Sequence, residues 1–284
     1  MSEFTRYLFA SGDAFFVGAL FLITAVIWLM RPKPAFPLIP GLLVCLGVIF
    51  IAFSSTPLPV AFYVIAAAVT FLWIFSRKSP KYGRYLSMLL IVTWLAGLVI
   101  ELPYAIMRHP QPVAQRRLTT IGDSITAGIS DNDDTWVKIL RREHSLEILD
   151  LSVAGETVSS ANKRLQSTTQ LDDLILIELG ANDMFGGHSG SRFEDDLRTL
   201  LTRLQAPSRQ LVMFELPLLP MFFHYGYTQR KLAKEFDVLL VPKRKLMSVL
   251  SGPSATSDSI HLTNAGQKQL ADLIWSVLSP AYER

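Results

Sequence analysis

Four long apolar stretches in the first 107 residues most constrain what this chain can form. The first three carry no charged side chain, and the fourth carries only Glu101. A helix that crosses a bilayer needs about 20 mostly apolar residues, within a range of about 17–25. Short segments rich in proline or charge separate the stretches, which is typical of helix ends. Residues 1–107 are therefore predicted to form four transmembrane helices: Ala14–Met30, Leu38–Phe53, Leu58–Phe75 and Leu86–Met107.

The charge distribution favours a membrane over a nucleic acid as the partner of this half. Only 18% of the residues are charged, whereas about 25% is usual for soluble domains. Residues 1–117 hold 10 Lys and Arg against 3 Asp and Glu, and residues 118–284 hold 17 against 21. The basic excess thus lies in the apolar half, as it does in membrane proteins. The single Cys45 excludes an intramolecular disulfide and a cysteine-based zinc cluster.

The positions of Lys and Arg predict the orientation of these helices. A cleaved signal peptide needs positive charge before its apolar stretch, but Arg31 and Lys33 follow the first one, which favours a retained helix. The loops after the first and third helices carry six Lys and Arg, and the N-terminus and outer turn carry one. The positive-inside rule then puts residues 118–284 outside the cytoplasm, in the periplasm of a bacterium with a multi-pass inner-membrane anchor. A re-entrant second stretch would instead leave them in the cytoplasm.

The second half has a different pattern, in which short β-type runs alternate with amphipathic helical segments. This alternation predicts a parallel sheet with helices on both faces, in a domain of residues 118–284 joined to the membrane region by a linker of residues 108–117. The expected strands are Leu118–Ile121, Leu146–Leu151, Leu174–Leu179, Leu211–Phe214 and Val238–Val241. The expected helices are Trp136–His144, Val158–Gln166, Arg192–Leu204, Thr228–Glu235 and Asn264–Leu278.

Four polar clusters follow strands of this predicted sheet. They are Gly122–Thr126, Ser152–Gly155, Gly180–Asp183 and Asp258–His261. Ligands bind at the carboxyl ends of parallel strands, so these clusters are expected to meet at one edge. Any one of them alone is read more simply as a turn or a helix cap. All four in order, each at a strand end, favour a catalytic site.

The residue types in these clusters fit nucleophilic catalysis by a serine. Ser124 directly follows a strand, and His261 is a base that could take its proton. Asp258, three residues before His261, would fix the tautomer of the imidazole and stabilise its charged form. The N–H groups of Ser124 and Gly155 and the side-chain amide of Asn182 would supply three donors to an oxyanion.

The second half resembles the SGNH (GDSL-type) hydrolase family over essentially residues 117–280. The motifs that carry the resemblance are GDSIT, the glycine in SVAGET, GAND and DSIH. The resemblance implies a flavodoxin-like α/β/α sandwich, with Ser124 as nucleophile, Asp258 and His261 as acid and base, and Gly155 and Asn182 in the oxyanion hole. It implies no metal and no organic cofactor. GDSIT replaces the family's GDSL at positions without a chemical role, and the G-x-S-x-G turn of α/β-hydrolases is absent around Ser124.

Other motifs are interpreted as structural. The run Asp131–Asp134 lacks the glycine and glutamate of a calcium loop, and a capped helix start is favoured there. His188 and His224 lack a second ligand at metal spacing, and the glycines of Gly186–Ser191 lack the lysine of a phosphate loop. The apolar segment Leu216–Tyr227 is expected to line an acyl pocket, to touch lipid, or simply to pack over the sheet edge.

The sequence therefore predicts a membrane-anchored serine esterase or lipase-like hydrolase that works through an acyl-serine intermediate. Its expected partners are the bilayer and an ester on a lipid or an envelope glycan, because a linker of about ten residues with arginines for anionic headgroups keeps the domain near the membrane. Two alternatives stay open. The triad could transfer an acyl group to a glycan hydroxyl, or the domain could be a non-enzymatic envelope module.

Overall fold

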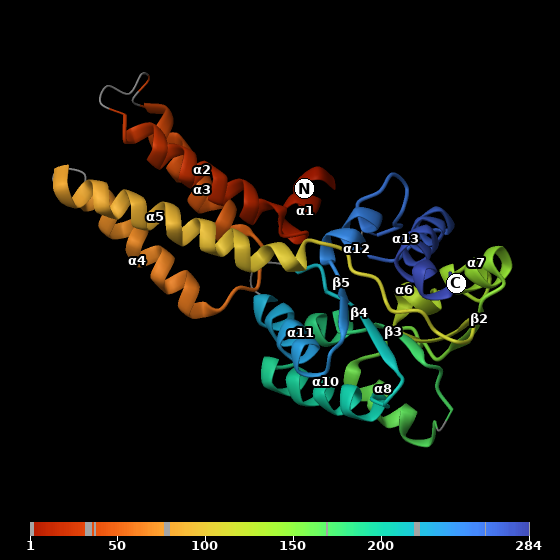
Figure 1. The fold of residues 1–284 in the computed structure, drawn as a ribbon. Helices are drawn as coiled ribbons and strands as arrows, with labels where there is room; N and C mark the ends of the chain where they lie inside the picture. Colours follow the sequence, from red (N-terminus) through yellow and green to blue (C-terminus); the bar gives the residue numbers. More distant parts are fainter. Residues whose placement is uncertain are drawn as a thin grey trace. The chain divides into compact units, whose positions relative to one another are not determined.

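The computed structural model describes residues 3–31, 36, 38–76, 80–168, 170–218, 222–258 and 260–283. The chain divides into two compact units (Figure 1). The helical unit comprises Leu8–Ile106 and Leu218–Phe223, and the α/β unit comprises Met1–Tyr7, Met107–Pro217 and His224–Arg284.

Four long helices form the helical unit, namely α2 (Asp13–Leu29), α3 (Leu38–Phe53), α4 (Val60–Ser76) and α5 (Pro80–Glu101). A short helix not predicted from the sequence, α1 (Glu3–Ala10), precedes them. Helix α2 packs against α3 and α5, and α4 packs against α5. The core includes Phe15, Leu22, Trp73 and Trp94.

Helices α2 and α3 approach each other closely at two glycines. A Cβ on Gly18 would lie 2.8 Å from the Gly47 carbonyl oxygen, and one on Gly47 would lie 2.9 Å from the Gly18 oxygen. Small residues at such crossings are typical of packed membrane helices.

The outer faces of these helices are also apolar. Large hydrophobic side chains such as Leu20, Leu42, Val64, Phe71 and Val99 are exposed there. Helices that are apolar inside and outside are expected in a bilayer rather than in water.

By length and composition, the helix at Tyr82–Tyr104 is long and apolar enough to cross a membrane. Helices α1 and α2 would supply a second span if they are counted as one, although the chain bends by 78° between them. Helices α3 and α4 are apolar but have 16 and 17 residues. Sixteen residues of helix extend about 24 Å, short of the hydrocarbon core of about 30 Å. The described residues thus contain one helix, or two if α1 and α2 count as one, that meets the length and hydropathy of a span, and the four-span arrangement stays a prediction.

The α/β unit is built on five parallel strands in the order β2-β1-β3-β4-β5. The strands are β1 (Arg117–Gly122), β2 (Glu147–Asp150), β3 (Leu174–Glu178), β4 (Gln210–Phe214) and β5 (Leu239–Val241). This is the doubly wound, flavodoxin-like strand order. The predicted parallel α/β fold is confirmed, and every predicted strand lies within two residues of the observed one.

Helices cover both faces of this sheet (Figure 1). Helix α7 (Trp136–His144) packs with α13 (Asn264–Tyr282), which also contacts α12 (Lys243–Leu250). On the other face, α8 (Val158–Arg164) packs with α10 (Gly190–Leu204), and α11 (Phe223–Glu235) lies beside them. Strand β3 is buried at every residue, because helices cover it on both sides.

The structure corrects several sequence-based boundaries. Helix α11 begins at Phe223 rather than Thr228, so the end of the predicted apolar segment Leu216–Tyr227 is helical; residues 219–221 of that segment lie outside the described residues. Helix α13 continues to Tyr282, because Pro280 is tolerated near its end. Helix α12, with Leu246 and Leu250 buried, was not predicted from its basic start.

The predicted linker of residues 108–117 packs along the α/β unit. The Val113 N–H donates to the Ala281 carbonyl (2.9 Å), and Gln111 and Gln210 exchange two hydrogen bonds of 2.6 and 2.9 Å. The Arg116 guanidinium lies over the rings of Trp275 and Tyr282, while Arg117 belongs to β1 and pairs with Glu147. These two arginines thus have contacts within the unit, and both are exposed.

Candidate active site

The predicted nucleophile lies in a tight turn at the end of β1. Gly122 ends the strand, and a Cβ there would lie 2.4 Å from the Thr126 hydroxyl, so the turn requires glycine. The Asp123 carboxylate accepts a hydrogen bond from the Ile125 N–H (3.0 Å) and caps the short helix α6 (Ser124–Ala127). Ser124 is the first residue of this helix and is half-buried.

The order of the strands brings the GDSIT and GAND clusters together. Strand β1 pairs with both β2 and β3, and Gly122 lies opposite Glu178 at the carboxyl end of β3. The strand order switches at this point, because β2 lies on one side of β1 and β3 on the other, and such switch points are where open α/β sheets bind their ligands. The site is therefore at the expected edge of the sheet.

Asn182 links the GDSIT cluster to the residue that follows Gly155. It lies in the short helix α9 (Ala181–Phe185). Its side-chain Nδ2 donates to the Asp123 carboxylate and to the Glu156 carbonyl, both at 3.0 Å. Both hydrogens of the side-chain amide are thus engaged. To donate to an oxyanion, Asn182 must give up one of these two hydrogen bonds.

Gly155 is at the same edge and exposed. Its φ of +76° is in the left-handed region, while a Cβ there would meet nothing within 4 Å. The backbone conformation, rather than a lack of space, therefore favours glycine at this position.

Asp258 and His261 form the pair that the sequence predicted. The Asp258 Oδ2 lies 2.6 Å from the His261 Nδ1, and Oδ1 accepts the N–H groups of Ile260 (3.0 Å) and His261 (2.8 Å). The hydrogen bond from the His261 ring, followed by those from the backbone, lowers the pKa of Asp258. This contact turns the His261 Nε2 away from Asp258.

The structure brings His261 near the nucleophile turn without a direct bond to Ser124. Among the described residues, no hydrogen bond joins the Ser124 hydroxyl to the His261 ring. Burial raises the pKa of Asp123, which adjoins Ser124, and the charge of His261 opposes this rise. Catalytic hydrogen bonds are often long before a substrate binds.

Glu178 is a buried acid at this edge that the sequence analysis missed. Its side chain is 2% exposed, and its Oε2 accepts from the Thr126 hydroxyl at 3.1 Å. The signal in the sequence is a glutamate that ends the otherwise apolar strand LILIE.

The neighbouring acids and histidines have structural contacts. Asp183 is buried, accepts from the Val158 N–H (3.0 Å), and lies 3.2 Å from the His188 ring. In the cluster proposed for a helix start, Asp133 accepts two backbone N–H groups and Asp134 pairs with Arg142. Within the described ranges, no group of three His, Cys, Asp or Glu residues is arranged to hold a metal ion.

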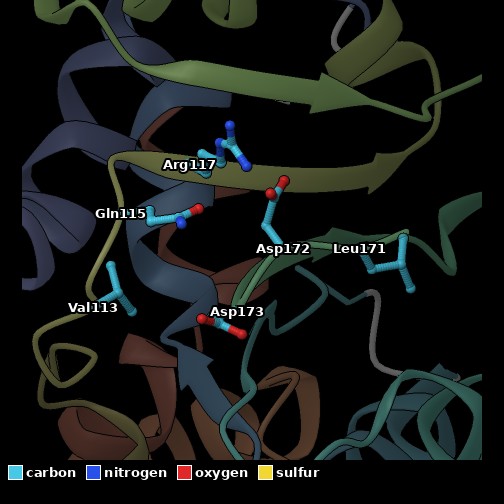
Figure 2. Close-up of a pocket in the computed structure, with 6 residues that line it drawn as sticks. All are labelled: Val113, Gln115, Arg117, Leu171, Asp172 and Asp173. Atoms are coloured by element: carbon cyan, nitrogen blue, oxygen red, sulfur yellow. The ribbon is translucent and has the colours of Figure 1, made fainter. Parts of the chain in front are cut away.

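A pocket at the opposite edge of the sheet is separate from this site. Figure 2 shows its lining of Val113, Gln115, Arg117, Leu171, Asp172 and Asp173. Arg117 begins β1, whereas Ser124 follows its end. The pocket therefore lies at the amino ends of the strands, and the predicted nucleophile lies at their carboxyl ends.

The doubly wound sheet, the serine turn at its switch point and the Asp-His pair before the last helix define an α/β enzyme of the serine hydrolase type. Residues 120–269 match the GDSL-like Lipase/Acylhydrolase family. This match covers more than half of the chain, and the chain therefore belongs to that family.

Curated relatives match the same part of the chain. Esterase TesA of Pseudomonas aeruginosa is 24% identical over 194 residues, which cover 62% of this chain and 94% of that protein. Thioesterase 1/protease 1/lysophospholipase L1 of Escherichia coli is 27% identical, covering 57% and 83%. Arylesterase of Vibrio mimicus is 26% identical, covering 57% and 87%. Together with the family match, these relatives identify the chain as an ester-cleaving hydrolase.

Solved structures show the same fold. The esterase EstA from Pseudoalteromonas sp. superposes with a TM-score of 0.52 at 20% identity, covering 57% of this chain and 96% of that one. The crystal structure of TesA gives a TM-score of 0.51 at 23% identity, covering 58% and 99%. These similarities confirm the architecture of the α/β unit.

Proposed function

We propose that this chain is a membrane-anchored serine esterase in which Ser124, His261 and Asp258 form the catalytic triad. The observation that carries the proposal is the 2.6 Å contact between Asp258 and the His261 Nδ1. It accompanies a serine turn at the switch point of a sheet that belongs to a hydrolase family. In the proposed triad, Asp258 orients the His261 ring, and His261 takes the proton of Ser124.

The reaction proceeds in two steps. The Ser124 oxygen attacks the ester carbonyl while His261 takes the hydroxyl proton through Nε2, and the N–H groups of Ser124 and Gly155 and the Asn182 amide stabilise the oxyanion. His261 gives the proton to the leaving alcohol, and the acyl group stays on Ser124. Water then attacks the acyl-serine with His261 as base, which releases the carboxylic acid and restores the hydroxyl.

The membrane anchor is part of this proposal. Four spans would fix the chain in the bacterial inner membrane, with residues 118–284 in the periplasm. The support is the exposed apolar surface of α2 to α5 together with the positive charge of the two expected cytoplasmic loops.

The proposed substrate is an acyl ester presented at the bilayer, on a lipid or an acylated envelope glycan. The Escherichia coli relative carries lysophospholipase L1 in its name, which is consistent with a lipid ester. The residues between α5 and β1 are few, and those from Gln111 onward bind the α/β unit, so the connection has little free length.

Covalent labelling of the nucleophile tests the proposal. Wild-type protein in detergent is expected to react with a fluorophosphonate and to hydrolyse a short-chain ester, and Ser124→Ala is expected to lose both. Ser130→Ala, which changes an exposed serine a few residues later, is the matched control and should keep both. Hydrolysis retained by Ser124→Ala would overturn the triad. An acylated product that forms only with an added glycan would show acyl transfer instead.

A further inference from the structure

Two buried acids adjoin each other beneath the nucleophile turn. Glu178 ends β3, Asp123 lies between Gly122 and Ser124, and each side chain is 2% exposed. Their carboxyl groups are hydrogen-bonded to each other. The Glu178 Oε2 also accepts from the Thr126 hydroxyl (3.1 Å) and faces the Asp123 N–H at 3.4 Å. The described polar partners of Glu178 thus all belong to the turn that carries Ser124.

Of these two acids, Glu178 is the one expected to hold a proton at neutral pH. Burial, followed by the negative charge of Asp123, raises the pKa of Glu178 well above its ordinary value. Asp123 accepts N–H groups from Ile125 and Asn182, which favour its charged form. Two adjoining buried carboxylates do not both ionise readily, so Asp123, which accepts these two N–H groups, is the one that keeps the charge.

The charged groups around the pair come from several elements. Burial is the largest cause of a raised pKa at Asp123; the charge of Asp183 of α9 adds to this rise, and the charge of His261, in the loop before α13, opposes it. Glu156, whose carbonyl also holds Asn182, is neutralised by Arg164 of α8. Strand β4, on the far side of β3, contributes apolar residues. Asp123, which carries the single negative charge of the pair, adjoins Ser124 and accepts from Asn182. This charge therefore lies close to where the oxyanion would form.

We propose that Glu178 is a positioning residue that works as a neutral acid. Its hydrogen bond holds the Asp123 carboxylate, which in turn anchors Asn182 and the Ser124 turn. Its neutrality also keeps the charge beside the oxyanion at one rather than two. This rests on the proposed roles of Ser124 and Asn182. A second negative charge there would oppose the oxyanion most strongly in a buried, water-poor site.

Substitutions at Glu178 test this role through the pH profile. Glu178→Gln keeps a donor toward Asp123 and an acceptor for Thr126 but cannot ionise, whereas Glu178→Leu keeps bulk without a donor. With a water-soluble ester, the kcat of wild type should fall at alkaline pH as Glu178 ionises. Glu178→Gln should match wild type at neutral pH and should not show this fall. Glu178→Leu should lose kcat by on the order of 100-fold, as for loss of an oxyanion donor. Glu147→Gln, the same change at an exposed position of β2, should leave the wild-type profile unchanged.

Infrared difference spectroscopy provides a readout independent of activity. The spectrum of wild type minus Glu178→Gln, taken on full-length protein in detergent, should show a protonated carboxyl C=O band at pH 7. This band should disappear with the same midpoint as the alkaline loss of kcat. Absence of the band at pH 7 would overturn the proposal, and so would parallel pH profiles of wild type and Glu178→Gln. Because the band requires no turnover, a failure of the proposed triad would be seen separately, in Ser124→Ala.

Discussion

At the scale of single residues, one amide side chain connects the loops at the carboxyl ends of the strands. Asn182 reaches Asp123 on one side and the Glu156 carbonyl on the other. Three chain segments that are far apart in sequence therefore depend on one pair of hydrogens. A substrate oxygen that enters between Ser124 and Asn182 would replace one of these bonds rather than fill an unused donor. The hydrogen bonds of Asn182 thus stabilise the site before a substrate binds.

The proton on Glu178 makes the stability of the folded protein depend on pH. Because the folded state raises the pKa of Glu178, it binds this proton more tightly than the unfolded chain, in which Glu titrates at about 4.3. The contribution of Glu178 to the stability of wild type is therefore full below a pH of about 4.3 and decreases above it. The decrease ends once the pH exceeds the pKa of Glu178 in the folded protein. Glu178→Gln does not titrate, so its Tm advantage over wild type should be smallest near pH 4 and larger at pH 8. Thermal unfolding followed by circular dichroism measures this, with Glu147→Gln as control. A difference that stays constant with pH would contradict it.

At the scale of elements, the contact between α2 and α3 depends on the absence of side chains. A methyl group on Gly47 would lie 2.9 Å from the Gly18 carbonyl and 2.8 Å from Leu22, whereas one on Gly41 of the same helix meets nothing. We expect Gly47→Ala to lower the stability of the helical unit, since overpacking costs about 1–3 kcal/mol. Gly41→Ala should be neutral or stabilising, because alanine favours a helix by about 0.5–1 kcal/mol over glycine. Apparent Tm values of both variants in detergent test this, and equal effects would exclude the close approach.

The elements with strong periodicity were predictable, and those held by tertiary contacts were not. Helix α7 was predicted at its observed bounds because its buried side chains recur at helical spacing. The short helices α6 and α9 are too brief for such a pattern, and their starts are fixed by Asp123 and Gly180. At the site, the Asp258–His261 contact followed from local spacing. The Glu178–Asp123 pair did not, because it depends on which strand lies next to β1.

At the scale of the whole molecule, the charge pattern predicts on which side of the membrane the hydrolase acts. A reporter that is active only in the periplasm should be active when fused after Arg284. The same reporter fused after Arg31, in the first expected cytoplasmic loop, should be inactive. A reporter that works only in the cytoplasm should give the opposite results. Cytoplasmic activity after Arg284 would exclude four complete spans and favour a re-entrant second stretch.

The hydrogen bond between Val113 and Ala281 has an evolutionary consequence. It puts the incoming and outgoing chain of the α/β unit side by side, where β1 begins rather than where Ser124 follows its end. A domain whose two ends meet away from its reactive groups can be joined to new sequence without disturbing them. The relatives fit this history, because the shared region covers 83–94% of their chains but only 57–62% of this one. The hydrolase domain can thus have been joined to the apolar helical region by gene fusion.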